Sequence, residues 1–296
     1  MPEPRWGRTT ILRQTSQYSG IIDDCTRYYI NPDSAMTCDY VLLGDANISS
    51  TWRSCGIKVV YAVLENPEIW MPSKSFLEHV DIVVTPYDLS SSLANNTKQI
   101  ISHTCVPWFY GISFATDQGL LHHPLSSRLE LDAMTSLPIP KKSRLLSIVV
   151  SNKGCTRGHR WRKELAVSLR SFFGNQIDIY GFGHNPISDK RHAIDRYAYT
   201  IVVENEVGNL YVTEKIVDSL LGWSCPIYSG SPMIEEIIGG PVPQIEFGGD
   251  IDSAVKKIAK IVSNLTIDYG CIRELRNNAL KRLNLMSHVP YLLSNV

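Results

Sequence analysis

The sequence predicts an α/β protein with two domains, on three observations. The chain has 296 residues, a length that suits two domains of about 150 residues each. Short apolar runs rich in β-branched residues alternate with amphipathic patterns of helical period, which is typical of parallel α/β units. A polar, proline-rich stretch over residues 120–142 separates two such sets and is interpreted as a linker. We therefore expect a first α/β domain over residues 1–142, a second over 143–280, and a helical tail over 281–296.

The first domain is expected to contain three buried strands. Its continuous apolar runs cover residues 40–44, 58–64 and 80–85, and such runs are typical of strands that are covered on both faces. Residues 73–79 lie between the last two runs and have the composition of a short helix.

The second domain repeats this alternation with longer helices. Its expected strands are 144–150, 176–181, 199–204 and 225–230, and its expected helices are 160–172, 214–221, 251–262 and 272–285. Two α/β domains joined by a linker place a ligand in the cleft between them, near the carboxyl ends of the strands.

Bulk composition excludes several classes of function. Lys plus Arg and Asp plus Glu both number 29, so no global field would attract nucleic acid or an anionic membrane. The first residues lack the apolar core of a signal peptide, and no run approaches the roughly 18 apolar residues of a membrane span. The seven cysteines are scattered, which favours reduced thiols and a cytoplasmic location. The oligomeric state stays open.

Two strand ends in the second domain carry residues suited to binding an anion. After the first strand, Asn152 and two arginines, Arg157 and Arg160, lead into a helix, where free N–H groups and guanidinium groups can hold a phosphate. A solvated capping loop is the alternative. After the next strand, Gly181 would let a ligand approach the backbone, although an incomplete glycine fingerprint is a weak signal and an ordinary turn explains it equally well.

A third strand end is more distinctive. The strand runs into Glu204 and Asn205, crosses a Gly-Asn loop, and starts a helix at Thr213, Glu214 and Lys215. Thr213 is a plausible N-cap. A lysine in the first turn interacts unfavourably with the positive end of the helix dipole. A phosphate bound at the helix start would make the same lysine favourable there. We therefore expect a phosphate-bearing ligand here.

These residues resemble the donor-binding signature of the α1,3/1,4-fucosyltransferases, glycosyltransferase family 10. Residues 203–215 match its E-N and Y-[VI]-T-E-K motifs, and residues 222–232 match its P-[IV]-x-x-G-x-P turn. Ordered agreement covers about residues 145–250. The resemblance implies a GT-B-like fold, in which two Rossmann-type domains face a central cleft and the first domain binds the acceptor. It also implies inverting transfer of fucose from GDP-fucose to a glycan acceptor.

The resemblance assigns roles by position. Lys215 would pair with the diphosphate, Glu214 would bind donor hydroxyls, and Tyr211 would line the nucleotide pocket. Either Arg157 or Arg160 would neutralise the leaving phosphate. The residues expected to bind the donor are Asn152, Arg157, Arg160, Gly181, Glu204, Asn205, Tyr211, Thr213, Glu214 and Lys215.

Inverting transfer needs a base that takes the proton of the acceptor hydroxyl. Glu65 follows a strand in the first domain and resembles the E-[SN]-x-P segment of the family at the cleft. We expect Glu65 to be this base, with Glu68 as the alternative. A loop glutamate without a catalytic role is the other interpretation.

Two departures from the family pattern leave alternatives open. Asp250 and Asp252 form a D-x-D that could hold a metal, but an aspartate before a helix is more often an N-cap. We expect no metal and no cofactor. Glu206 stands where the family commonly has serine. A different nucleotide-sugar donor, or a non-catalytic module that binds a glycan or a nucleotide, is therefore the alternative function.

Overall fold

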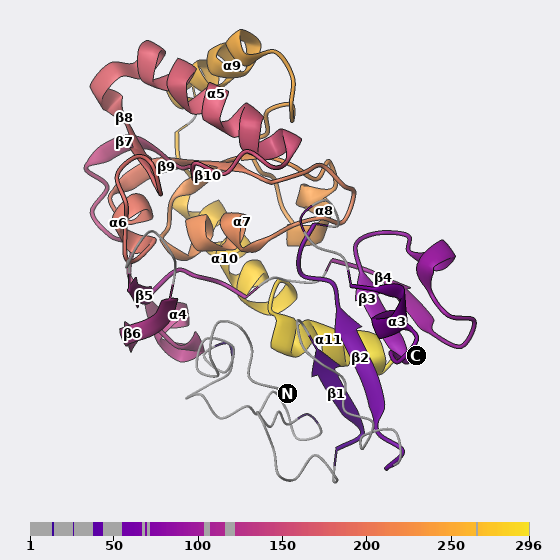
Figure 1. Cartoon of the computed structure of the whole chain (residues 1–296). Coiled ribbons are helices and arrows are strands. Elements are labelled where there is room, and N and C mark those ends of the chain that lie inside the picture. The colour runs from indigo at the N-terminus through magenta and orange to yellow at the C-terminus, as the bar shows by residue number, and fades with distance from the viewer. Residues whose placement is uncertain are drawn as a thin grey trace.

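Two parallel four-stranded sheets organise the chain, in the orders β1-β2-β3-β4 and β10-β9-β7-β8 (Figure 1). The structure is a computed structural model and describes residues 38–43, 55–66, 69, 72–103, 107–115, 122–264 and 266–295, together with residues 14 and 26. Each sheet is flanked by helices, so the predicted α/β class with two Rossmann-type domains is confirmed.

Three of the four strands of the first sheet form from the predicted apolar runs, and the fourth, at residues 98–101, was not predicted. Its elements are β1 (Tyr40–Leu43), β2 (Lys58–Ala62), α3 (Lys74–Leu77), β3 (Ile82–Thr85), the 3-10 turn η3 (Ser90–Ser92) and β4 (Lys98–Ile101). All pairings are parallel, and Val60 lies opposite Ile82. Ser73 starts α3, because its hydroxyl accepts the N–H of Phe76 at 3.2 Å. Residues 59–63 and 82–85 are buried, as such runs predict.

The segment interpreted as a linker contains regular structure. After β5 (Ile112–Ala115) come β6 (His122–Arg128), antiparallel to β5, and helix α4 (Leu131–Ser136). Strand β6 has a polar sequence without the apolar pattern of a buried strand, so it was not predicted. It pairs with β5 through the backbone. Helix α4 is anchored by Arg276, whose guanidinium donates to the carbonyl oxygens of Met134 and Thr135. The connection therefore contains regular secondary structure and is more than an irregular linker.

The second sheet carries helices on both faces. Its elements are β7 (Arg144–Val149), α5 (Arg157–Phe173), the 3-10 turn η5 (Gly174–Gln176), β8 (Ile177–Tyr180), α6 (Arg191–Ile194), β9 (Tyr197–Val203), α7 (Glu214–Leu221), β10 (Cys225–Ser229) and α8 (Ile234–Ile238). Figure 1 shows α5 and α9 over one face and α7 and α10 over the other. The chain leaves β7 toward β8 and returns on the other side as β9. Such a switch in direction favours a ligand site at the carboxyl ends of these strands.

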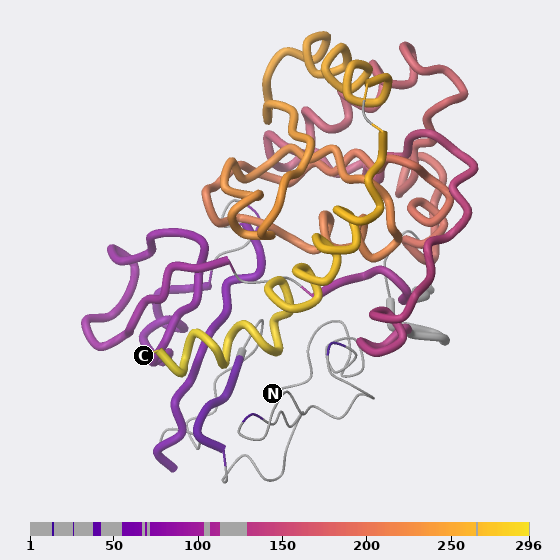
Figure 2. The backbone as a smooth tube through the Cα atoms, turned by 180° about the vertical axis from the view of Figure 1, so that it is seen from behind, coloured from indigo at the N-terminus to yellow at the C-terminus, as the bar shows by residue number. Residues whose placement is uncertain are grey.

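The last helices connect the second sheet back to the first. Helices α9 (Ile251–Asn264) and α10 (Tyr269–Arg282) are followed by α11 (Leu285–Leu293), which lies against the first sheet (Figure 2). The indole of Trp108 donates to the carbonyl of Leu283 at 2.9 Å, and Ser102 Oγ lies 2.9 Å from Nε2 of His288. In the part of the chain that the structure describes, no helix is both long enough and apolar enough to span a bilayer.

Candidate functional site

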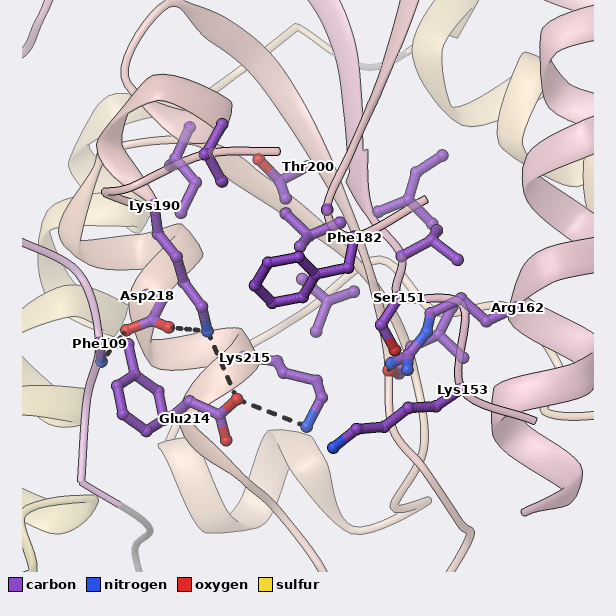
Figure 3. Close-up of a pocket in the computed structure, with 18 of the residues that line it drawn as sticks. Phe109, Ser151, Lys153, Arg162, Phe182, Lys190, Thr200, Glu214, Lys215 and Asp218 are labelled. Carbon is purple, nitrogen blue, oxygen red and sulfur yellow. Dashed lines mark hydrogen bonds and ion pairs between the residues drawn. The ribbon is translucent and has the colours of Figure 1, made fainter. Parts of the chain in front are cut away.

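A cavity of about 260 Å³ lies where β7, β8 and β9 end (Figure 3). The sheet order places these ends together, and the start of α7 closes one side. Phe109, from the segment that crosses between the two sheets, lines the cavity as well. The site therefore lies at the switch point of the second sheet and touches the connection to the first.

The cavity has an apolar wall and a cationic edge. The wall is formed by Phe182 and by aliphatic side chains that include Val149, Val150, Ile187, Ile194 and Ile201. Lys153, Arg162, Lys190 and Lys215 bring positive charge to the cavity. Such a lining suits a ligand with a flat apolar part and an anionic part.

Lys215 is held in place by a chain of hydrogen bonds. Its Nζ atom lies 2.8 Å from Thr213 Oγ1, and that hydroxyl donates to Glu204 Oε2 at 2.7 Å. Glu204 is fully buried and also accepts the N–H of Thr213 at 3.0 Å. The hydroxyl of Thr213 therefore does not cap α7, although Thr213 stands at the N-cap position. Glu204 is enclosed and holds Thr213 and Lys215 in place; that it binds the donor stays a prediction.

Glu214 lines the cavity beside two ammonium groups. Its Oε1 atom lies 3.4 Å from Lys190 Nζ and 3.6 Å from Lys215 Nζ. Burial alone would raise the pKa of this carboxyl, but Lys215 and Lys190 outweigh it and lower the pKa to about 2. Glu214 is therefore an ionised hydrogen-bond acceptor at the edge of the cavity.

The arginine at the cavity is Arg162, and the predicted pair lies elsewhere. Arg157 donates to Gly248 O at 3.0 Å and Arg160 to Gly154 O at 3.0 Å, and both side chains are exposed. Neither is among the residues that line the cavity. That one of them neutralises the leaving phosphate stays a prediction, and the lining of this cavity does not support it.

Arg162 lies on the buried face of α5. Its Nη1 atom donates to Val203 O at 2.7 Å, and its Nη2 atom lies 3.3 Å from Asn205 Oδ1. Its Nε atom has no partner among the described residues. Burial lowers the pKa of this guanidinium, while Glu204 and Glu214 oppose that effect. An enclosed arginine with an unused donor at a cavity wall is suited to an anion.

Sequence spacing contained a signal for Arg162 that the prediction did not use. Gly158, Arg162, Leu165 and Leu169 are all buried and follow helical spacing along one face. A charged residue within an apolar stripe of this kind is seldom buried without a partner or a function.

Asn205, Asn152 and Gly181 have different positions. Asn205 supports the site, because its carbonyl accepts the Thr156 hydroxyl at 2.9 Å and its side chain contacts Arg162. Asn152 is exposed and is not part of the cavity lining. Gly181 does line the cavity, with a φ of 112°, and a Cβ atom there would collide with the carbonyl of Val150. Gly181 is therefore required by the backbone geometry of the wall.

Tyr211 lies at the junction of the two domains and not in the cavity lining. It is 4% exposed, and its ring centroid is 5.9 Å from that of Tyr87 in the first domain. Burial raises the pKa of the Tyr211 hydroxyl well above its usual value, and the charges of Glu204 and Glu65 add to the effect. The Oε1 atom of Glu65 accepts the N–H of Asn66 at 3.1 Å. Glu68 lies outside the described residues.

The D-x-D segment behaves as a helix start. Asp250 Oδ2 accepts the N–H of Ser253 at 2.8 Å at the beginning of α9, as expected of an N-cap. Within the described ranges, no three His, Cys, Asp or Glu side chains come together in a way that could hold a metal ion.

Comparisons with known proteins agree with the sequence motifs. The family model for the C-terminal part of the glycosyltransferase family 10 fucosyltransferases matches residues 139–240. A putative fucosyltransferase-like protein of Arabidopsis thaliana is 28% identical over 140 residues, which is 46% of this chain and 26% of that protein. The matched segment thus spans about a quarter of that relative's length. The predicted family resemblance is confirmed over this segment.

Solved structures with similar folds include glycosyltransferases. A crystal structure of α1,3-fucosyltransferase with GDP-fucose matches 95% of this chain and 89% of its own, with 18% identity and a TM-score of 0.47. The pneumococcal O-GlcNAc transferase GtfA in complex with UDP and GlcNAc matches 86% of this chain and 56% of its own. It has 9% identity and a TM-score of 0.48.

Proposed function

Because residues 139–240 carry a glycosyltransferase family 10 domain, we propose that this chain transfers L-fucose from GDP-fucose to a hydroxyl of a glycan acceptor. The observation that carries this proposal is the Lys215–Thr213–Glu204 chain at the cavity edge. A buried carboxylate and a hydroxyl fix the ammonium at the start of α7. The partner of the Lys215 ammonium would be a phosphate that also accepts hydrogen bonds from the free N–H groups at the start of the helix.

The shape and charge of the cavity support a nucleoside diphosphate. The apolar wall around Phe182 suits the flat base, and Arg162 and Lys215 suit the two phosphates. Glu214, ionised and directed at the same space, would accept a hydrogen bond from a ribose hydroxyl. These contacts together position the sugar at the mouth of the cavity, facing the first domain.

The proposed reaction is a single inverting displacement. Glu65 takes the proton of the acceptor hydroxyl as its oxygen attacks C1 of the sugar, and the bond from C1 to the diphosphate breaks on the opposite side. Arg162, Lys215 and the N–H groups of α7 neutralise the leaving diphosphate. A metal ion is then not needed for that purpose. The charge of Glu65 acts on the buried hydroxyl of Tyr211, which is consistent with a carboxylate on the first-domain side of the segment from Glu204 to Lys215.

A donor panel tests the proposal. The protein is incubated with GDP-fucose, GDP-mannose, UDP-glucose and UDP-N-acetylglucosamine in EDTA, and release of the nucleoside diphosphate is measured with and without a mixture of oligosaccharide acceptors. We expect release from GDP-fucose to exceed release from the other donors and to persist in EDTA. Turnover that EDTA abolishes and manganese restores would contradict metal independence and would make Asp250 and Asp252 the ligands to test.

Glu206 favours a second candidate within the same class. It replaces the serine common in the family and is partly buried in the donor loop, next to Asn205. A carboxylate there changes the hydrogen bonds offered to the sugar, so a different donor sugar is the alternative. Preferential turnover of another nucleotide sugar in the panel would support it. Tight binding of GDP without turnover of any donor would instead support a non-catalytic binding module.

A further inference from the structure

Helix α7 carries two buried carboxylates one turn apart. Glu214 lies at its first position and Asp218 four residues later, and their side chains are 12% and 2% exposed. Lys190 lies between them, with its Nζ atom 2.5 Å from Asp218 Oδ2 and 3.4 Å from Glu214 Oε1 (Figure 3). Burial alone would lower the pKa of Lys190, but the two carboxylates outweigh it and raise the pKa. The lysine is thus a fixed cation that relieves the repulsion between two buried anions.

Asp218 also holds the connection between the two domains. Its Oδ1 atom accepts the N–H groups of Phe109 and Tyr110, at 2.9 Å and 2.8 Å. These two residues lie in the segment that crosses from the first sheet to the second. The Phe109 ring lies 5.1 Å from Lys190 Nζ and lines the cavity. One oxygen of Asp218 therefore binds the crossing segment, and the other binds the lysine that contacts Glu214.

We propose that Lys190 is a positioning residue that couples occupation of the donor site to the interdomain connection. It orients Glu214 toward the donor and, through Asp218, fixes the backbone at Phe109 and Tyr110. Donor binding and a fixed crossing segment then stabilise each other, because any coupling of two equilibria is reciprocal. This inference rests on the proposed nucleotide-binding function and adds a link between that site and the arrangement of the domains.

The surroundings of Lys190 favour positioning over direct contact with phosphate. To bind a phosphate directly, the Lys190 ammonium would have to leave Asp218. The side chain of Asp218 is 2% exposed, so its charge would then be buried without a partner. Breaking a buried pair in this way is strongly unfavourable. Lys215 also lines the cavity, and its Nζ atom lies farther from its carboxylate neighbours, 3.4 Å from Glu204 and 3.6 Å from Glu214, so it is better placed to bind an anion.

The test compares Lys190→Met with the wild type in two measurements. GDP affinity is determined by calorimetric titration, and hydrogen exchange is followed in the peptide that contains Phe109 and Tyr110, with and without GDP. In the wild type, we expect GDP to slow exchange in that peptide. In Lys190→Met, we expect affinity to fall about 10- to 100-fold, as for loss of a charge-assisted contact. Exchange should become faster and independent of GDP at saturating concentrations. Lys190→Arg should restore part of both effects.

Lys142→Met is the matched control. Lys142 is also a partly buried lysine at this junction, but it donates to the carbonyls of Asp195 and Gly222, at 2.8 Å and 2.7 Å, and does not line the cavity. We expect this variant to lose thermal stability while its GDP affinity stays within about twofold of the wild type, because it keeps every cavity residue. A loss of affinity as large as that of Lys190→Met would overturn the specific role of Lys190.

Two further results would overturn the inference. One is a Lys190→Met variant with wild-type affinity and exchange, while Lys215→Ala abolishes binding; the proposed function would then stand and this inference alone would fail. The other is a variant that loses affinity but retains GDP-dependent exchange at saturation, which would make Lys190 a simple phosphate ligand. If wild-type protein binds no nucleoside diphosphate, both the proposed function and this inference fail.

Asp218→Asn provides a second variant, in case Lys190→Met does not fold. It keeps the shape of the side chain and removes the charge that holds Lys190. We expect faster exchange in the Phe109 and Tyr110 peptide together with weaker GDP binding. Faster exchange with unchanged GDP affinity would show that the crossing segment and the donor site are independent, and would overturn the proposal.

Discussion

Arg162 and Arg157 lie five positions apart on helix α5 and have opposite environments. Arg162 is buried among the strand ends, and its Nε atom has no hydrogen-bond partner in the described part of the chain. Arg157 is exposed and donates to the carbonyl of Gly248. The difference arises because one turn of a helix takes 3.6 residues, so these two positions face in different directions. Both arginines were visible in the sequence, but the start and rotation of the helix decide which one reaches the cavity.

Replacement of Arg162 by methionine should weaken nucleoside diphosphate binding. The guanidinium supplies charge and directed hydrogen-bond donors in a site from which water is partly excluded. Such a contact contributes about 1.5–3 kcal/mol to the binding free energy. We expect GDP affinity to fall about 10- to 100-fold in Arg162→Met, with partial recovery in Arg162→Lys. Arg157→Met is the matched control and should bind GDP as the wild type does. Calorimetric titration measures both, and weaker binding in the control alone would reverse the assignment.

Glu65→Gln should separate donor binding from transfer. The amide keeps the shape of the carboxylate but cannot accept the proton of the acceptor, so transfer should fall by about 10²- to 10⁴-fold. GDP affinity should change less than about twofold, because Glu65 is not among the residues that line the cavity. The measurement compares the transfer rate and the GDP titration in one preparation.

Two variants serve as controls for Glu65. Glu78→Gln changes an exposed glutamate of the same domain and should transfer normally. Normal transfer by Glu65→Gln, with loss in Glu68→Gln, would move the role of base three residues along the chain.

At the level of elements, the start of α5 packs directly on the loop after β9. A Cβ atom on Gly158 would lie 2.6 Å from the carbonyl oxygen of Glu204 and closer still to that of Asn205. The hydroxyl of Thr156 donates to the same Asn205 carbonyl at 2.9 Å. The start of α5 and the loop after β9 are therefore set against each other by backbone contact.

Gly158→Ala should destabilise the second domain. The added methyl group meets backbone atoms that cannot move without displacing Glu204, so the free energy of unfolding should fall by about 1–3 kcal/mol. Gly154→Ala is the control, because its Cβ atom would meet the end of the Lys163 side chain at 3.4 Å, which can move. Chemical denaturation of both variants checks this. Equal stabilities would show that α5 shifts freely on the loop.

The elements that could be predicted were those with a strong periodic signal. Buried parallel strands such as β3 and β9 are short apolar runs, and α9 has a clear amphipathic period, so both kinds were found. Strand β6 and helix α4 were interpreted as a linker, because backbone pairing and the contacts with Arg276 produce no hydrophobic periodicity in the sequence. The presence of Glu214 and Lys215 at the cavity followed from a motif whose residues lie close together in the sequence. The role of Asp218 at Phe109 could not, because 109 residues separate the partners.

At the scale of the whole molecule, helix α11 of the C-terminal part packs against the first domain. The rings of His103 and His288 stack with centroids 4.0 Å apart, which joins this helix to the end of β4 in the first domain. Burial lowers the pKa of His103 to about 3, with His288 and Arg282 adding to the effect, and burial lowers that of His288 to about 4. Both rings are therefore neutral in the folded protein at neutral pH.

This pair should make stability depend on pH. Unfolded histidines bind a proton near pH 6.5, whereas the folded pair does so at about pH 3 to 4. Between these values the unfolded state holds more protons, so the free energy of unfolding should decrease as pH falls from 7 to 4.

His288→Gln removes one titrating ring and should flatten this dependence. The exposed His184 provides the control, and His184→Gln should retain the wild-type slope. Denaturant titrations at several pH values measure the effect. An identical slope in His288→Gln and the wild type would show that the pair does not link α11 to folding.

The most direct test of the whole account is a calorimetric titration with GDP in EDTA, comparing the wild type with Lys215→Ala. The ammonium of Lys215 is fixed by Thr213 and Glu204 at the edge of the cavity, and it should pair with a diphosphate largely removed from water. We expect one GDP per chain in the wild type and an affinity about 10- to 100-fold lower in a folded Lys215→Ala variant. The absence of binding in the wild type, or unchanged affinity in the folded variant, would contradict the assignment of this cavity to a nucleotide-sugar donor.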